Sequence, residues 1–202
     1  MTSPFDVVRD FEEALAEYGG SQFAVATTSC TMALFLACAW FRHKDGPRTV
    51  SIPKRTYVGV GMSVLNAGHR IRFSNVEWLG KYRLGPLPVV DAARWLTSGI
   101  HVRGEMTCLS FHWAKHLAVS QGGAVLLEDQ DADAWLRRAR FDGRREGVAP
   151  KDDVFDMVGW HAYMSPATAA EGLTRLALLP KHNDPLPNSD YSDLSQAPIF
   201  RS

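Results

Sequence analysis

The stretch QFAVATTSCTMALFLACAWF, residues 22–41, contains the elements that decide the fold. Residues 22–28 form a short apolar run of the kind that makes a buried strand. A turn of small polar residues follows at 27–31, and the apolar run from Met32 to Phe41 is long enough for a buried helix. Strand, polar turn and helix in this order predict the first unit of an α/β fold.

The same alternation extends through most of the chain. An apolar stripe at three- and four-residue spacing predicts an amphipathic helix from Phe5 to Tyr18, with Ser3 and Pro4 as its cap and first turn. Further strands are expected at 50–52, 70–76, 87–90, 106–111 and 124–127, and further helices at 57–67, from 129 or 131 to 140, and at 166–179. The pattern predicts a three-layer α/β architecture, with a mostly parallel sheet covered on both faces and right-handed crossovers.

Two segments lack this periodicity. Residues 143–156 are charged and contain Gly and Pro, so a surface loop is expected there. The final stretch, PKHNDPLPNSDYSDLSQAPIFRS at 180–202, has four prolines and predicts an extended tail that is ordered only if it docks on the rest of the chain. The expected organisation is one domain, residues 1–180, followed by a C-terminal tail, residues 181–202.

Composition narrows the class of protein. A chain of 202 residues, 46% apolar and 22% charged, can bury one sizeable core, and 22 basic against 22 acidic side chains create no overall field for nucleic acid or membrane. Three cysteines without CxxC spacing argue against a disulfide scaffold and for a reducing compartment. No apolar run approaches a membrane span, and the start has no signal-peptide pattern, so the expected location is the cytoplasm.

Four features with chemical potential follow the predicted strands, where ligands bind in such sheets. Lys115 lies in SFHWAK, among aromatic and apolar neighbours that can lower the pKa of its amine. Asp91 ends the preceding strand, where a carboxylate can hold a proton on a heteroaromatic nitrogen. A strand-to-helix turn offers N–H groups and hydroxyls that bind phosphate, at Thr28, Ser29 and Thr31, and Ser110 adds a hydroxyl near the lysine. Together these are the requirements of pyridoxal 5′-phosphate.

Each feature also has an ordinary structural interpretation. A lysine after a strand is commonly a solvated surface residue, and an aspartate at a strand end commonly caps a helix. Ser or Thr before a helix commonly serves only as its cap. The order and spacing of these residues, rather than any one of them, favour a cofactor site.

Longer motifs resemble one known family, in the order that the family has them. TTSCTMAL at 27–34 is similar to the SGTxAL phosphate-binding turn, and residues 52–77 are similar to PxxTFVATxxAVLxAGAxPVFxDVD. VVDAARWL at 89–96 resembles the EDAAQA box, SFHWAKHLAVSQGGAVLLED at 110–129 resembles SFxxxKxLxxGEGGxVxTxD, and residues 160–176 resemble GYNYRMSxIQAAxGLxQL. These motifs are those of the DegT/DnrJ/EryC1/StrS aminotransferases, fold-type I pyridoxal-phosphate enzymes that mostly aminate keto-sugar nucleotides.

The resemblance implies a role for each matching residue. Lys115 takes the place of the lysine that forms the Schiff base with the cofactor, and Asp91 that of the partner of the pyridinium nitrogen. Tyr57 takes the place of the aromatic side chain that stacks on the ring, with Ala93 against the other face. The implied phosphate ligands are Ser29, Thr31 and Ser110. In the family the transferred amine comes from glutamate or glutamine.

Several cofactor-contacting positions depart from the family pattern. Cys30 replaces the glycine of the turn, where its side chain could crowd the phosphate. Arg94 replaces the glutamine or histidine near the cofactor O3′. His161 stands where the family has an asparagine that reaches the phosphate in the partner subunit, and Tyr163 stands where it has an arginine.

Two parts of the family pattern are also shortened. Between Glu77 and Val89 only residues 78–88 remain, where the family has a further strand and helix of the large domain. The carboxy-terminal small domain, which closes over the substrate in the family, is not found after the helix that ends near Leu179. Cofactor binding is therefore better supported than amino transfer.

Two other patterns have weaker functional interpretations. His112 and His116 form an HxxxH pair that can bind zinc on a helix, but they flank Lys115 with no evident third ligand, so no metal is expected. Nine basic residues could form an anion-binding surface or simply a solvated face, and the second interpretation is preferred. They are Lys81, Arg83, Arg94, Arg103, Arg137, Arg138, Arg140, Arg144 and Arg145.

The leading hypothesis is a compact pyridoxal-phosphate aminotransferase-like enzyme that acts on a keto-sugar nucleotide or similar small carbonyl substrate. A homodimer with shared active sites is expected, because sites of this family are completed across the two-fold interface. One alternative is a pyridoxal-phosphate enzyme that catalyses decarboxylation or elimination on a bulky nucleotide or nucleic-acid-linked amine. Another is a catalytically degenerate binding or regulatory subunit. Nucleic acid is a disfavoured partner, and no membrane is expected.

Overall fold

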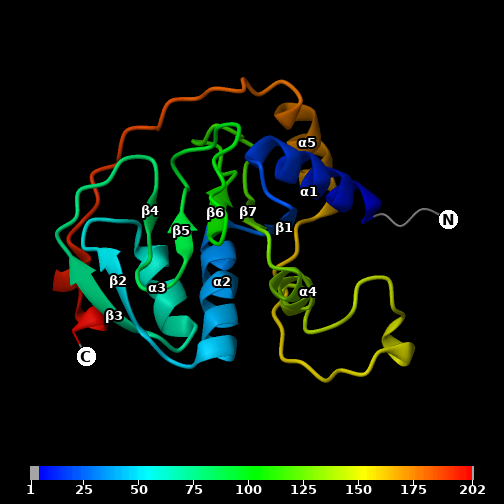
Figure 1. Cartoon of the computed structure of the whole chain (residues 1–202), viewed down its shortest axis with the longest axis horizontal. Helices are drawn as coiled ribbons and strands as arrows, with labels where there is room; N and C mark the ends of the chain where they lie inside the picture. Colours follow the sequence, from blue (N-terminus) through cyan, green and yellow to red (C-terminus); the bar gives the residue numbers. More distant parts are fainter. Residues whose placement is uncertain (1–4, 202) are drawn as a thin grey trace.

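The computed structural model describes residues 5–201, which form a mixed α/β fold (Figure 1). The expected cap and first turn at Ser3 and Pro4 lie outside the described residues. The α-helices are α1 (Asp6–Gly19), α2 (Cys30–Asp45), α3 (Val58–Asn66), α4 (Gln130–Ala139) and α5 (Pro166–Leu176). The strands are β1 (Phe23–Thr27), β2 (Thr49–Pro53), β3 (Arg70–Ser74), β4 (Tyr82–Arg83), β5 (Val89–Asp91), β6 (Met106–Ser110) and β7 (Gly123–Leu127). Short 3-10 helices are η1 (Pro150–Asp152), η2 (Leu194–Gln196) and η3 (Pro198–Phe200).

The strands form two sheets that meet at one bridge. The larger has the order β1-β7-β6-β5-β4, and the smaller consists of β2 and β3. Ser51 in β2 donates its N–H to the carbonyl of Gly85, 2.6 Å away, beyond the end of β4. The two-residue strand β4 thus occupies the junction between the two sheets.

The predicted α/β fold is present, but the prediction that its strands pair mostly in parallel is wrong. Among the described strands, β5–β6 and β2–β3 are parallel, whereas β1–β7, β6–β7 and β4–β5 are antiparallel. A loop without a helix, residues 111–122, connects β6 to β7, and a short turn connects β4 to β5. Parallel pairing of consecutive strands needs a long crossover, so these connections produce antiparallel pairs.

The predicted three-layer arrangement is confirmed by the two apolar clusters. Alternate strand residues such as Val25, Cys108 and Val125 are buried with α2, α3 and α4 on one face of the larger sheet. Their neighbours Ala24 and Leu109 are buried with α1 and α5 on the other face. This period-two alternation is what a sheet covered on both faces requires.

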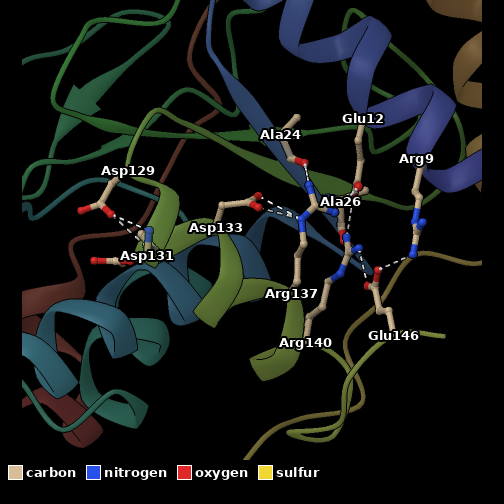
Figure 2. A network of polar contacts seen from close by, with 11 residues as sticks. Arg9, Glu12, Ala24, Ala26, Asp129, Asp131, Asp133, Arg137, Arg140 and Glu146 are labelled. Atoms are coloured by element: carbon tan, nitrogen blue, oxygen red, sulfur yellow. Dashed lines mark hydrogen bonds and ion pairs between the residues drawn. The ribbon is translucent and has the colours of Figure 1, made fainter. Parts of the chain in front are cut away.

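A buried charge network ties the layers together (Figure 2). Glu12 of α1 pairs with Arg137 of α4 and with Arg140, which caps the end of α4. Arg140 also pairs with Glu146 at 2.7 Å. Both arginines donate to carbonyls of β1, at Ala24 and Ala26. Burial alone would lower the pKa of Arg140, but its two glutamate partners outweigh burial and raise it.

The basic residues around 137–145 form neither a free anion-binding surface nor, at the buried Arg140, a solvated face. Four of their guanidinium groups bind carboxylates of this chain: those of Arg137, Arg138, Arg140 and Arg145. An anion-binding surface needs positive charge that is available to a ligand. The charge of this basic cluster is therefore largely neutralised, which does not favour a nucleic-acid-linked substrate.

The segment after α5 docks along the molecule. In Figure 1 it runs as an orange-to-red trace from α5 across the top of the view to the side of β2 and β3. The indole of Trp95 donates to the Asn183 carbonyl at 2.7 Å, and Leu186 donates its N–H to the Arg94 carbonyl at 2.9 Å. Further along, the ring of Phe200 packs on that of Phe73. The C-terminal segment was expected to be ordered only if it docks on the rest of the chain, and these contacts show that it does dock.

Candidate active site

One cavity of about 410 Å³ brings most of the predicted site residues together. It lies beyond the carboxyl ends of β5 and β6 and at the amino end of α2. Of the ten predicted cofactor-binding residues, nine line it: Ser29, Cys30, Thr31, Tyr57, Asp91, Ala93, Arg94, Ser110 and Lys115. Residues that are up to 86 positions apart in the sequence therefore share one site.

The amino end of α2 forms one end of this cavity. Ser29 caps the helix, and its hydroxyl accepts the N–H of Met32 at 3.1 Å. The first-turn N–H groups of Cys30 and Thr31 have no acceptor within the helix, and the helix dipole adds partial positive charge there. Gly123 allows β7 to press against this turn, because a Cβ at that position would collide with the backbone of Ser29 and Cys30. The turn can thus receive a phosphate.

Asp91 forms the acidic group of the cavity. The residue is only 5% exposed, and its two carboxylate oxygens accept from the Ala93 N–H at 2.9 Å and from the Tyr82 hydroxyl at 2.8 Å. Burial raises the pKa of this carboxyl, while the two hydrogen bonds and the charge of Lys115 act in the opposite direction. The cavity is thus lined by a carboxylate that binds a proton more tightly than an ordinary aspartate does.

Lys115 supplies the amine of the same cavity. It lies half-buried in the β6–β7 loop, where its N–H donates to the His112 carbonyl. Burial lowers the pKa of its amine, Arg94 lowers it further, and Asp91 opposes both. A lowered pKa leaves more neutral amine near pH 7, and neutral amine is the nucleophilic form.

Tyr57 and Ala93 provide two walls that suit a flat ring. Tyr57 precedes α3 and is 57% exposed at the cavity, whereas Ala93 follows β5. Gly59 makes the position of Tyr57 feasible, because a Cβ there would lie within 3 Å of the Tyr57 ring and the Thr31 hydroxyl. The exposed phenol ring is free to stack on a ligand.

The two cavity residues that depart from the family pattern, Cys30 and Arg94, have different environments. Cys30 is buried, and burial together with Asp91 raises the pKa of its thiol well above the ordinary value, so the thiol stays neutral. Arg94 reaches the docked C-terminal segment, donating to the hydroxyl of Ser189 at 3.2 Å and to the carbonyl of Pro187. The segment and the cavity are therefore linked through Arg94.

His161 is the one predicted site residue that lies outside the cavity. It is exposed, and its Nδ1 lies 2.9 Å from a carboxylate oxygen of Asp142. Tyr163 packs its ring on the imidazole at a centroid distance of 4.6 Å. Because the resemblance assigns His161 to the phosphate in a partner subunit, its role stays a prediction.

The structure adds residues that the sequence did not indicate. Tyr82 donates to Asp91, and Thr56 contacts the Tyr82 hydroxyl. Trp78, Ser189 and Tyr191 line the cavity. Tyr191 lies in the phrase DYSDL at 190–194, which resembles one near the ends of some family members, whereas Ser189 lies outside it. For Tyr82 no sequence signal existed, because its contact depends on strand pairing.

The histidine pair has structural partners. His116 lies between the Leu96 N–H and the Asp184 carbonyl, and His112 packs on Trp113. Within residues 5–201 no group of three or more His, Cys, Asp or Glu side chains is placed to hold a metal ion. In the same range, no helix combines the length and apolar character needed to cross a membrane.

The fold is that of the large domain of pyridoxal-phosphate aminotransferases. The chain belongs to the DegT/DnrJ/EryC1/StrS aminotransferase family, whose profile matches residues 1–79 and 92–185. Family and neighbouring structures are pyridoxal-phosphate-dependent aminotransferases, which confirms the predicted cofactor class. Comparison with curated protein sequences found no significant match.

Solved structures share this fold at low sequence identity. AtS13 from Actinomadura melliaura superposes with a TM-score of 0.72 at 19% identity, covering 85% of this chain and 59% of that one. The sugar aminotransferase CalS13 from Micromonospora echinospora gives 0.72 at 18% identity, covering 85% and 60%. Helicobacter pylori PseC, an aminotransferase of pseudoaminic acid biosynthesis, gives 0.68 at 18% identity, covering 85% and 57%. The chain thus spans less than two thirds of these proteins.

Proposed function

We propose that this chain binds pyridoxal 5′-phosphate in the 410 Å³ cavity and transfers an amino group to a keto-sugar nucleotide or similar small carbonyl substrate. One observation carries the proposal: a half-buried lysine and a buried carboxylate face the same cavity at the amino end of α2. The lysine has a lowered amine pKa, and the carboxylate has a raised one. Opposed shifts of this kind are typical of active sites.

Each group of the cavity has a use in that chemistry. When bound, the cofactor supplies an electron sink for the substrate carbon. Ser29, Thr31 and Ser110, with the free N–H groups of α2, would bind its phosphate, and Tyr57 and Ala93 would flank its ring. Asp91 would hold a proton at the ring nitrogen. Lys115 Nζ would bond the cofactor and, once released, move a proton at the reacting carbon.

The segment after α5 would supply part of the substrate wall. Ser189 and Tyr191 line the cavity, and Tyr191 stacks on Trp78 with ring centroids 6.0 Å apart. The expected division into a cofactor-binding domain, residues 1–180, and a docked tail, residues 181–202, is part of this proposal. A substrate that enters the cavity would meet side chains from both parts.

A second copy of the chain would complete the site. His161 and the loop before it do not line the cavity, and this loop exposes the apolar side chains of Val154, Phe155 and Val158. Exposed apolar patches commonly mark interfaces. The proposed assembly is a homodimer with shared active sites in the cytoplasm, and His161 would reach the partner's phosphate.

Absorbance spectroscopy of the purified chain with added pyridoxal phosphate tests the proposal. We expect the band that the cofactor gains when it bonds to a lysine amine, and borohydride followed by peptide mapping should place the reduced cofactor on Lys115. Lys115→Ala should abolish the band, whereas Lys151→Ala, in the exposed 3-10 helix η1, should leave it unchanged. Absence of the band in the wild-type chain would refute the proposal.

Amino transfer is tested separately, with L-glutamate or L-glutamine as donor and a keto-sugar nucleotide as acceptor. The expected result is loss of the cofactor band with the donor and its return with the acceptor. A chain that binds the cofactor but supports neither half of this cycle would favour the degenerate binding or regulatory subunit. That alternative draws on the coverage of the relatives, about 60% of their length, and on the engagement of Arg94 by the C-terminal segment.

A further inference from the structure

Tyr82 lies where the family pattern offers no guidance, because the family match is interrupted between residues 79 and 92. The shortened segment folds into β4, which pairs antiparallel with β5 so that Tyr82 stands directly opposite Asp91. Opposed residues on neighbouring strands are within contact range. The Tyr82 hydroxyl donates a 2.8 Å hydrogen bond to Asp91 Oδ2.

The hydrogen bonds around Tyr82 run in one direction. Burial and the charge of Asp91 raise the pKa of the Tyr82 phenol well above its ordinary value, so the phenol keeps its proton. A phenol has one proton to donate, and that proton goes to Asp91. Thr56 must therefore donate in its 2.6 Å contact with the Tyr82 oxygen. The chain from Thr56 through Tyr82 ends on a carboxylate, where a hydrogen bond is strengthened by charge.

We propose that Tyr82 is a positioning residue for Asp91, holding its carboxylate in place and in the ionised form at the wall of the cofactor cavity. The role rests on the proposed function, because an ionised Asp91 is useful only if it meets a protonated ring nitrogen. Asp91 Oδ1 is held independently by the Ala93 N–H, so each oxygen has one fixed donor. The remaining lone pairs of the carboxylate are left for a ligand.

The other groups around Asp91 do not replace this contact. Cys30 approaches from α2 and Cys108 from β6, and burial raises the pKa of both thiols, so both are neutral. Lys115, in the β6–β7 loop, acts on Asp91 through its charge. Since this lysine also has a lowered pKa, it loses that charge more readily than an ordinary lysine. The Tyr82 hydroxyl is a donor that stays protonated over the working pH range.

The ring of Tyr82 is supported independently of its hydroxyl. Trp78 packs on it with ring centroids 4.6 Å apart, and the Trp78 indole is itself anchored by a 3.0 Å hydrogen bond to the Arg55 carbonyl. Tyr82→Phe should therefore retain the fold while it removes the hydrogen bond to Asp91.

Carbon-13 NMR titration of the Asp91 carboxyl in the cofactor-free full chain tests the role, with the signal assigned by Asp91→Asn. Tyr82→Phe should raise the titration midpoint by roughly 1 to 2 pH units, the size expected for loss of one hydrogen bond to a charged group. Thr56→Val should raise it by a smaller amount. Tyr18→Phe, whose hydroxyl contacts the Pro180 carbonyl instead, should leave it unchanged.

An unchanged or lowered midpoint in Tyr82→Phe would overturn the role. If that variant does not fold, Thr56→Val decides in the same way. In cofactor-loaded protein the pH at which the absorbance band changes should move in the same direction. A wild-type chain that binds no cofactor but shows the NMR shift would refute the proposed function and keep the Tyr82 effect on Asp91. Cofactor binding with an unshifted midpoint would refute the role of Tyr82 alone.

Discussion

Two groups of buried charges in this molecule are built in opposite ways. In the Glu12 cluster, made of Glu12, Arg137, Arg140 and Glu146, the acidic and basic side chains form ion pairs with one another (Figure 2). The cavity cluster is made of Asp91, Lys115 and Arg94. Within residues 5–201 no carboxylate lies within 4.0 Å of Lys115 Nζ, and Asp91 holds neutral donors instead of a cation. Removing one partner of a buried pair leaves an uncompensated charge in the fold, whereas charges that face a cavity unpaired can meet a ligand.

The largest expected effect comes from breaking the Glu12 cluster. Glu12→Ala should lower the free energy of unfolding by about 3–5 kcal/mol, because Arg140 would remain buried without its main partner. Urea unfolding measures the loss. Glu13→Ala, at an exposed neighbouring position, is the matched control and should stay near the wild-type value. Equal effects of the two substitutions would contradict the comparison.

Asp91→Asn should affect chemistry more than stability. An amide cannot hold a proton on the ring nitrogen, so the rate of the half-reaction with the amino donor should fall by about 10- to 100-fold. The free energy of unfolding should change little, since the amide is cheaper to bury than a carboxylate. Stopped-flow absorbance and urea unfolding on the same preparation measure both. A large loss of stability with normal chemistry would make Asp91 structural.

The pH dependence of Lys115 gives a smaller effect with a definite sign. Because burial and Arg94 lower the pKa of its amine, bonding to pyridoxal phosphate should rise with pH at lower values than for a free lysine. Arg94→Met removes a nearby positive charge, so the midpoint should move upward by roughly one unit. Arg103→Met, at a side chain that is 93% exposed, should not move it. A downward shift in Arg94→Met would contradict this electrostatic explanation.

The smallest effect is expected at an exposed ion pair that belongs to neither cluster. Arg103 and Glu128 lie 3.5 Å apart at the surface. Arg103→Ala should change the free energy of unfolding by less than about 0.5 kcal/mol, because water screens such pairs. A loss comparable to that of Glu12→Ala would show that burial is not what separates the two kinds of charge.

Local patterns predicted most elements closely. The apolar stripe predicted a helix at 5–18, where α1 spans Asp6–Gly19. The apolar run at 106–111 predicted the strand before Lys115, where β6 spans Met106–Ser110. The strand β4 escaped prediction because two residues contain no periodicity. The parallel or antiparallel direction of strand pairing was also not predicted, because it depends on which strands become neighbours and not on the residues of each strand.

The sequence by itself determined the α/β class, the family and the placement of Ser29, Asp91 and Lys115 beside strand and helix ends, because these depend on local periodicity and short motifs. Only the tertiary structure decided that Arg137 and Arg140 are buried ion-pair partners rather than a basic surface. It likewise decided that Tyr82 contacts Asp91 and that Ser189 reaches the cavity. These contacts join residues distant in the chain or on paired strands, and the free energy that selects them comes from burial and pairing across the whole fold.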